Sequence, residues 1–289
     1  MAYYQGSEVS SKLIDTLIQK LTSIPEGAIE PFWKSIQSGS YADEGFVLRS
    51  KGSSGKDNII IRIKGILNYV GLTVSILEGY TPNPVQGLVG VVTNEIPIAV
   101  QYTTSSTYGS NIPVNYWLSF DKDKIMLLVA GSINISSTYK NFVWAGMPER
   151  LSEESDSTAV TLAVSNFSHT LADAASTTNG FSGIVKMLRN RKQEISQKVH
   201  QKSMMISVKN IGWGDCFILP DIFLEHGSDE GVRAKLPGVS PVSGIINVDF
   251  KDLDEVTVGS RRFVIHKTNN VSGNNMSSFL SDYLAIEKL

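Results

Sequence analysis

The pattern of apolar and polar positions is clearest from Tyr116 to Ala130, YWLSFDKDKIMLLVA. Aromatic and apolar side chains fill most of residues 116–120, and Asp121 to Lys124 supplies a charged turn. Ile125 to Ala130 is a continuous apolar run, short enough for a buried strand and too short to cross a membrane. The pattern predicts two strands joined by a charged hairpin turn, around which the other elements are arranged.

A helix is predicted before this hairpin, over Ser10 to Ile24. Its apolar residues recur at spacings of three and four and form one stripe. They are Leu13, Ile14, Leu17, Ile18 and Leu21. Ser10 or Ser11 is the expected N-cap, and Pro25 with Gly27 ends the helix. We expect the stripe to pack against the chain's own core, with a partner surface as the alternative.

After residue 41 the pattern changes to a period of two, which is typical of β-strands. Just before it, Ile29 to Ser40 predicts a short helix or an irregular arm. Between residues 65 and 77 we expect a pair of strands, and Asn94 with Glu95 is the expected turn between two later strands. The remaining strands are predicted over 46–48, 58–63, 87–92, 96–102, 139–145, 158–164, 203–208, 216–219, 254–258 and 261–266, with a last strand or short helix over 279–286.

These elements predict a mainly β fold, a β-sandwich-like arrangement of antiparallel sheets with an N-terminal amphipathic helix. We divide the chain into an N-terminal helix and arm, residues 1–40, and a β-rich domain, residues 41–289. Residues 168–202 are a candidate insertion. Apolar residues between 180 and 200 partly fit helical spacing, so a helical insertion and an extended arm are both open there.

Composition and charge narrow the range of partners. Charged residues make up 19% of the 289 residues, below the usual share of about 25%, and Ser, Thr, Asn and Gly supply the polarity instead. That mixture is common in β-rich proteins of assemblies. The net charge is −2 and the densest basic cluster is 189–192, so we expect no nucleic-acid partner and read the cluster as a solvated helix end. No signal-peptide pattern or long apolar segment is present, so we expect cytoplasmic synthesis and no membrane partner.

The sequence offers no motif for catalysis, a metal or a cofactor. The histidines lack metal-binding spacing; they are His169, His200, His226 and His266. The single Cys216 excludes an internal disulfide, and we expect a small buried side chain there. The loop SKGSSGKD, residues 50–57, has the wrong spacing for a phosphate-binding loop and is followed by a strand, so a surface hairpin is expected.

Two groups of carboxylates were considered as sites. The loop of residues 151–157 carries Glu153, Glu154 and Asp156, but it lacks the spacing of a calcium loop and is expected to be solvated. A pair of carboxylates could also serve a hydrolase without being close in sequence, and Asp215, Asp221 and Glu225 are the candidates. We expect no catalytic, cofactor-binding or metal-binding residues and no enzymatic activity.

Three segments together resemble a family of tailed-bacteriophage virion structural proteins, also found in prophage-derived tail-like particles. The first is MAYYQGSEVSSKLIDTLIQKLTS at the start of the chain. The second is YWLSFDKDKIMLLVAGSINISSTYKNFVWAGMPERL, and the third joins LPGVSPVSGI with VTVGSRRFVIHKT. Residues 171–202 resemble no part of the family. The resemblance implies an assembly component without enzymatic activity and transfers no site residues.

We therefore expect a non-enzymatic structural subunit of a bacteriophage virion or contractile tail-like particle. A neck or collar position, or a tail or baseplate position, would place it in a symmetric ring, with itself and other virion or tail proteins as partners. One alternative is a receptor- or glycan-binding module of the same particle, which predicts an exposed cluster that includes Trp33, Trp144 or Trp213. The second alternative is a cell-wall hydrolase.

Overall fold

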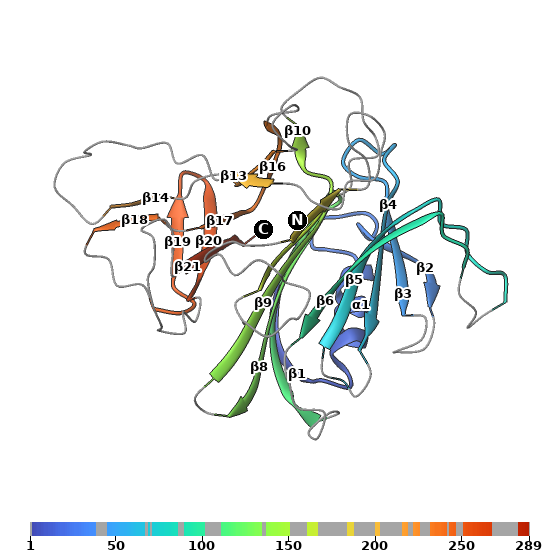
Figure 1. Ribbon diagram of the computed structural model, residues 1–289, viewed down its shortest axis with the longest axis horizontal. Coiled ribbons are helices and arrows are strands. Elements are labelled where there is room, and N and C mark those ends of the chain that lie inside the picture. The colour runs from blue at the N-terminus through green and yellow to red at the C-terminus, as the bar shows by residue number, and fades with distance from the viewer. Residues whose placement is uncertain are drawn as a thin grey trace.

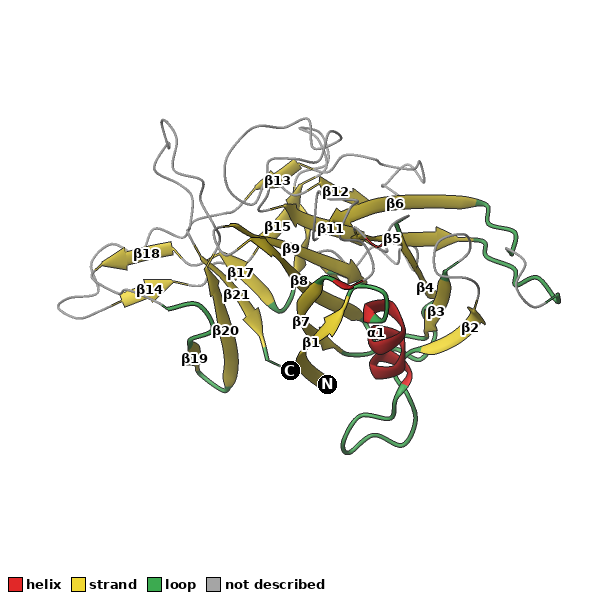
Figure 2. Cartoon of the chain, turned by 90° about the horizontal axis from the view of Figure 1, so that it is seen from below, coloured by secondary structure: helices red, strands yellow, loops and turns green. Residues whose placement is uncertain are grey.

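The computed structural model confirms the mainly β, antiparallel fold. It describes residues 2–38, 45–66, 69, 71–85, 90–101, 111–134, 137–150, 161–166, 184–187, 200–202, 216–218, 222–225, 232–241, 243–246, 251–267 and 283–288, and the structural statements below concern these residues. Their one helix is α1, Leu13–Thr22. Figures 1 and 2 show strands in layers, with α1 between two of the sheets.

The predicted hairpin lies in the middle of a six-stranded sheet, called here the central sheet. Its order is β1 (Ala2–Val9), β7 (Pro113–Phe120), β8 (Lys124–Asn134), β9 (Ser137–Gly146), β11 (Thr161–Asn166) and β12 (Ile184–Met187). The β7–β8 register pairs Phe120 with Ile125 and Trp117 with Leu128. The hairpin predicted from Tyr116 to Ala130 is thus confirmed.

Two further sheets cover the central sheet. The first, called the helix-side sheet, is ordered β2 (Lys34–Ser38), β3 (Phe46–Ser50), β4 (Ile59–Gly65), β5 (Gly71–Glu78) and β6 (Asn94–Gln101). The second, called the C-terminal sheet, is ordered β17 (Val239–Pro241), β21 (Tyr283–Glu287), β20 (Arg261–Lys267) and β19 (Glu255–Val258). Smaller sheets join β10 (Glu149–Arg150), β16 (Val232–Leu236), β15 (Ile222–Glu225) and β13 (His200–Lys202), and β14 (Cys216–Ile218) with β18 (Ser243–Ile246).

Alternate residues of the hairpin enter two separate hydrophobic clusters, so both faces of the central sheet are buried at this hairpin. Leu118, Ile125 and Leu127 belong to the cluster shared with α1 and the helix-side sheet. Trp117 and Leu128 belong to a cluster shared with β16 and the C-terminal sheet. This double burial explains why Ile125 to Ala130 is apolar at every position rather than at every second one.

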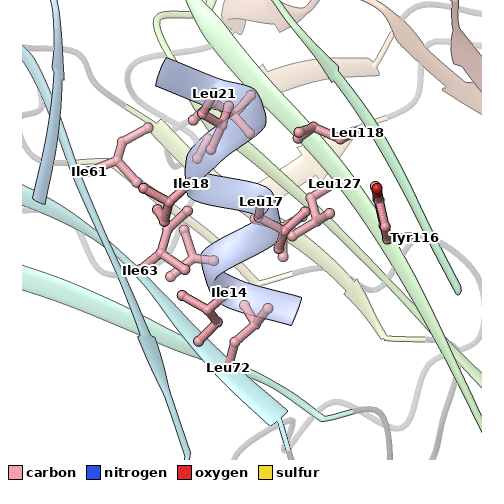
Figure 3. Packing of buried hydrophobic residues seen from close by; sticks show 14 of the residues in the cluster. Ile14, Leu17, Ile18, Leu21, Ile61, Ile63, Leu72, Tyr116, Leu118 and Leu127 are labelled. Atoms are coloured by element: carbon pink, nitrogen blue, oxygen red, sulfur yellow. The ribbon is translucent and has the colours of Figure 1, made fainter. Parts of the chain in front are cut away.

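Helix α1 fills the space between the central and helix-side sheets. Figure 3 shows its apolar stripe against Ile61 and Ile63 on one side and against Leu118 and Leu127 on the other. All five predicted stripe residues are buried, whereas Asp15 and Gln19 are exposed. The stripe therefore packs into the chain's own core, as the favoured interpretation predicted.

The predicted N-cap of α1 is wrong. Lys12 holds the cap position, with no side-chain hydrogen bond to the helix. The backbone N–H of Ser10 instead donates to the carbonyl oxygen of Ile112 at 2.9 Å, and that of Lys12 donates to Val9 at 2.9 Å. The tight connection from β1 thus sets where the helix begins, ahead of any capping preference.

Several local predictions are also corrected. Residues 34–38 form strand β2 rather than a helix or irregular arm, because Trp33 is fully buried and anchors the chain beside the sheet. Asn94 and Glu95 lie inside β6, opposite Glu78 and Leu77, instead of in a turn. Residues 65–77 yield one new strand, β5, after a turn in which Tyr69 N–H donates to the Ile66 carbonyl at 3.0 Å.

The C-terminal hairpin was predicted correctly. β19 and β20 pair across the turn at Gly259 and Ser260, and β21 adds to β20 as the final strand. Within the candidate insertion 168–202, residues 184–187 and 200–202 are strands, so the helical alternative is wrong at 184–187, where β12 pairs with β11. The predicted strand 203–208 and residues 158–160 and 87–89 lie outside the described residues.

Residues on both sides of the predicted boundary at residue 40 share one hydrophobic cluster: α1 and Trp33 pack with residues of β3, β4 and β5. The division into residues 1–40 and 41–289 itself stays a prediction.

Neighbouring leucines on β8 test the double burial directly. Leu127 is 2% exposed and faces α1, while Leu128 is fully buried and faces the C-terminal sheet. We expect Leu127→Ala and Leu128→Ala each to lower the free energy of unfolding by about 2–5 kcal/mol, because each leaves a cavity in a packed core. Chemical denaturation measures both, with Gln19→Ala on the exposed face of α1 as the control. A near-neutral Leu128→Ala would mean that this face is not covered.

Candidate interaction surface

The candidate catalytic and metal-binding residues either pack in the core or a sheet, or lie outside the described part of the chain. Among the described residues no group of three or more His, Cys, Asp and Glu could hold a metal ion, and no helix has the length and apolarity to span a membrane. His266 is buried on β20, with its ring edge-on to Trp117 at 5.0 Å between centroids. This is the contact of a core residue.

The described residues do not show the candidate catalytic carboxylates close to one another. Glu225 ends β15, where its Cα is the register partner of His200 on β13. Asp215 and Asp221 lie outside the described residues, as do the acidic loop residues Glu153, Glu154 and Asp156. His169, His226 and the basic cluster 189–192 lie outside them too, and for Cys216 on β14 only the backbone is described. The hydrolase interpretation therefore stays untested.

The Ser50–Asp57 loop fastens the helix-side sheet to the central hairpin. Ser50 Oγ donates to the Lys122 carbonyl at 2.5 Å, and the Ser53 N–H donates to Asp123 Oδ1 at 2.7 Å. The loop joins β3 to β4, so the surface-hairpin prediction is confirmed.

A buried ion pair orders the charged turn. Asp121 Oδ2 lies 2.6 Å from Lys124 Nζ, and its Oδ1 accepts from the N–H groups of Asp123 and Lys124 at 2.8 and 3.0 Å. The Asp121 carbonyl accepts from Trp33 Nε1 at 2.8 Å. Because both charges are paired and hydrogen-bonded, burial of this turn is tolerated, and the turn can join the two sheets.

The three tryptophans among the described residues do not form the exposed cluster that a glycan-binding module would present. Trp33 and Trp144 are fully buried, and Trp117 is 8% exposed. Trp144 Nε1 donates to the carbonyl oxygen of Pro237 at 3.1 Å, so its polar atom is also used inside the molecule. Trp213, the third candidate, lies outside the described residues.

The sheet edges differ in how well they resist pairing with another chain. Of the described edge strands only β1 and β6 have eight residues, and β6 carries Pro97, which cannot donate a backbone hydrogen bond. β2 carries Lys34 and a bulge between Ser35 and Gln37. Charges, prolines, bulges and short length all discourage edge pairing, and β1 has none of these from Ala2 to Ser7.

Strand β1 is held from both faces and open at its edge. Towards α1, Tyr4 stacks on Phe120 at 6.0 Å between centroids, with Lys20 Nζ 5.1 Å from the Tyr4 ring centroid. Towards the C-terminal sheet, Lys288 Nζ lies 5.2 Å from the Tyr3 ring centroid. The middle of the strand, residues 5–7, is exposed. β1 is therefore a rigid edge strand that another chain can reach.

Glu8 and Gly6 of strand β1 also make specific contacts. Glu8 Oε2 accepts from Thr16 Oγ1 at 3.3 Å on α1, and Glu8 Oε1 accepts from the N–H of Val9 at 2.9 Å. The Tyr116 ring lies over Gly6, so that a Cβ there would be 2.9 Å from Tyr116 Oη. Burial, and next the Glu8 carboxylate, raises the pKa of Tyr116. A side chain at position 6 would therefore require the Tyr116 ring to shift.

The loop after α1 presents apolar side chains close to this edge. Ile24 is 58% exposed and Ile29 is 98% exposed, although Pro25 between them is buried. A turn shapes the loop, since Ala28 N–H donates to the Pro25 carbonyl at 3.0 Å and Gly27 has a φ of +76°. Figure 2 shows the loop projecting from the end of α1 on the side where both chain ends lie.

The sequence did not predict strand β1. Tyr3 and Tyr4 face opposite cores, and Gly6 interrupts the alternation, so neither a helical nor a strand period is visible there. The run of uncharged residues before Glu8 was the available signal. No protein-family model, curated protein or solved structure matches this chain.

Tyr3 provides a test of how closely β1 packs against the C-terminal sheet. Burial, and next the Glu255 carboxylate, raises the pKa of Tyr3 from 10.0 to about 12. Between these two pH values the unfolded chain loses the Tyr3 proton before the folded chain does, so the stabilisation from Tyr3 is complete below pH 10 and is lost towards pH 12. We expect the free energy of unfolding to fall more steeply over this range in the natural chain than in Tyr3→Phe. Equal slopes in urea denaturation would place Tyr3 in solvent.

Proposed function

We propose that this chain is a non-enzymatic structural subunit of a bacteriophage virion or a contractile tail-like particle. The observation that carries the proposal is an unprotected, eight-residue edge strand, β1, beside a loop with exposed isoleucines. An open strand edge can pair with a strand of another chain, and exposed apolar side chains beside it can add contact area. The resemblance of the three segments quoted above supports a particle as the setting.

The way that β1 is built favours a permanent contact over a transient one. The strand pairs with β7 over its whole length without a register shift, and aromatic contacts hold it on both faces. A partner strand added to a rigid edge does not need to order it first, so less conformational entropy opposes binding. Subunits of a symmetric particle repeat one such contact many times.

The proposed position is at the neck or collar, or in the tail or baseplate, with copies arranged in a ring. The buried Asp121–Lys124 ion pair and the buried tryptophans described above stabilise the layers of the molecule and leave the surface loops and edges for contacts. The burial of Trp33 and Trp144 argues against a glycan-binding surface built on these two residues.

Particle composition tests this proposal. Particles made by the host that encodes this chain are purified on a density gradient, treated with salt and analysed by quantitative mass spectrometry. We expect the chain at a fixed ratio to the other particle proteins, and deletion of its gene should give incomplete particles. Supply of the natural chain in trans is the control and should restore assembly. Complete, functional particles without the chain would contradict the proposal.

A further inference from the structure

We propose that β1 pairs with β1 of a second copy of this chain, antiparallel about a two-fold axis at Gly6, so that the two central sheets become one. The inference rests on the proposed function for its biological role and names one of the contacts that assembly uses. In a particle such a two-fold contact would join two rings, or two subunits of facing layers.

β1 has unused backbone hydrogen-bonding groups along its open edge. β1 uses one side of its backbone for β7, and the N–H and C=O groups of the other side face outward along the open edge. Helix α1 keeps to the inner side of this edge, since Leu17 and Leu21 lie against Leu118 and Leu127 of β7 and β8 (Figure 3). Residues 5–7, at the middle of the strand, are exposed.

The two-fold symmetry of the pair limits the register of the two strands. Directly opposite residues of an antiparallel pair point to the same face of the sheet. When the two strands are identical and related by a two-fold axis, one residue must therefore face its own copy. The middle of the eight-residue strand lies between Gln5 and Gly6, so the axis of a fully paired strand passes through one of these two.

Charge decides between the two registers. With Gly6 on the axis, Glu8 of the second copy lies opposite Tyr4, whose ring is covered by the Lys20 ammonium at 5.1 Å. With Gln5 on the axis, Glu8 lies opposite the buried Ala2, two residues away from the Tyr4 ring that Lys20 covers. The Gly6 register thus brings each Glu8 to a Lys20 and keeps the two Glu8 carboxylates apart.

Two features of the surroundings fit this arrangement. Gly6 has no side chain, and Tyr116 closes the face beneath it, so two strands can approach closely on the axis. Tyr4 Oη lies 3.5 Å from Ser23 Oγ, which places the next residue, Ile24, beside the same edge. A second copy on β1 therefore approaches the loop that exposes Ile24 and Ile29.

Cysteine cross-linking tests the pairing and its register. In a Cys216→Ala background, which removes the single natural cysteine, Gln5→Cys and Ser7→Cys are made separately. In the Gly6 register residue 5 lies opposite residue 7 of the other copy. A mixture of the two variants should form disulfide-linked dimers under mild oxidation, whereas each variant alone should not. Gln19→Cys, exposed on α1, measures random cross-linking.

An unlinked mixture overturns the proposal, and so does a Gln5→Cys variant that links to itself, which would place the axis at Gln5. Circular dichroism confirms that each variant is folded. The outcome is independent of particle composition: a chain found in particles but never linked through β1 keeps the proposed function and loses this contact.

A charge exchange tests the role of Lys20. Glu8→Lys and Lys20→Glu should each weaken dimerisation roughly tenfold in sedimentation velocity, because each creates two like-charge contacts per dimer. The double variant should restore most of the affinity, because the pair is re-formed with its charges exchanged. A natural chain that stays monomeric at every concentration, or a double variant no better than the singles, overturns the proposal.

Discussion

Burial of the β7–β8 hairpin on both faces is the constraint on which the rest of this molecule depends. An antiparallel sheet usually keeps one face in water, and its strands then alternate. Here α1 and the helix-side sheet cover one face, while β16 and the C-terminal sheet cover the other. The strands of the β7–β8 hairpin must therefore be apolar on both sides, and the surrounding layers can be packed only by segments from both ends of the chain.

Burial on both faces also limits contacts with other molecules to the sheet edges and the loops. A sheet whose faces are both covered can meet another molecule only along its margin, where unpaired N–H and C=O groups remain. β1 forms one margin of the described sheet, and the four-residue β12 forms the other. Lys20 from α1 and Lys288 beside β21 flank the two tyrosines of β1, so both covering layers also shape the edge. The layers that stabilise the central sheet thus also form the surroundings of the edge proposed for association.

The sequence predicted the parts of the fold in which local pattern and burial agree. The hairpin from Tyr116 to Ala130, the stripe of α1 and the hairpin at Gly259 each have a clear period or turn signal. β1 was missed because Tyr3 and Tyr4 are partly buried on opposite faces, which removes the alternation. Asn94 and Glu95 look like a turn, yet pairing with Glu78 and Leu77 places them in β6. Whether a strand lies at a sheet edge depends on the order of the strands in the sheet. That order cannot be predicted from the local pattern of apolar and polar residues.

Hydrogen exchange of the backbone amides is the most direct test of the doubly covered sheet and its open edge. We predict that amides of β7, β8 and β9 in the free chain exchange only when the whole molecule unfolds, and that those of β1 are the fastest of the described strands around this core. In assembled particles the β1 amides should become as slow as their neighbours. Fast exchange over residues 125–130 of the free chain, or β1 amides unchanged by assembly, would contradict this account.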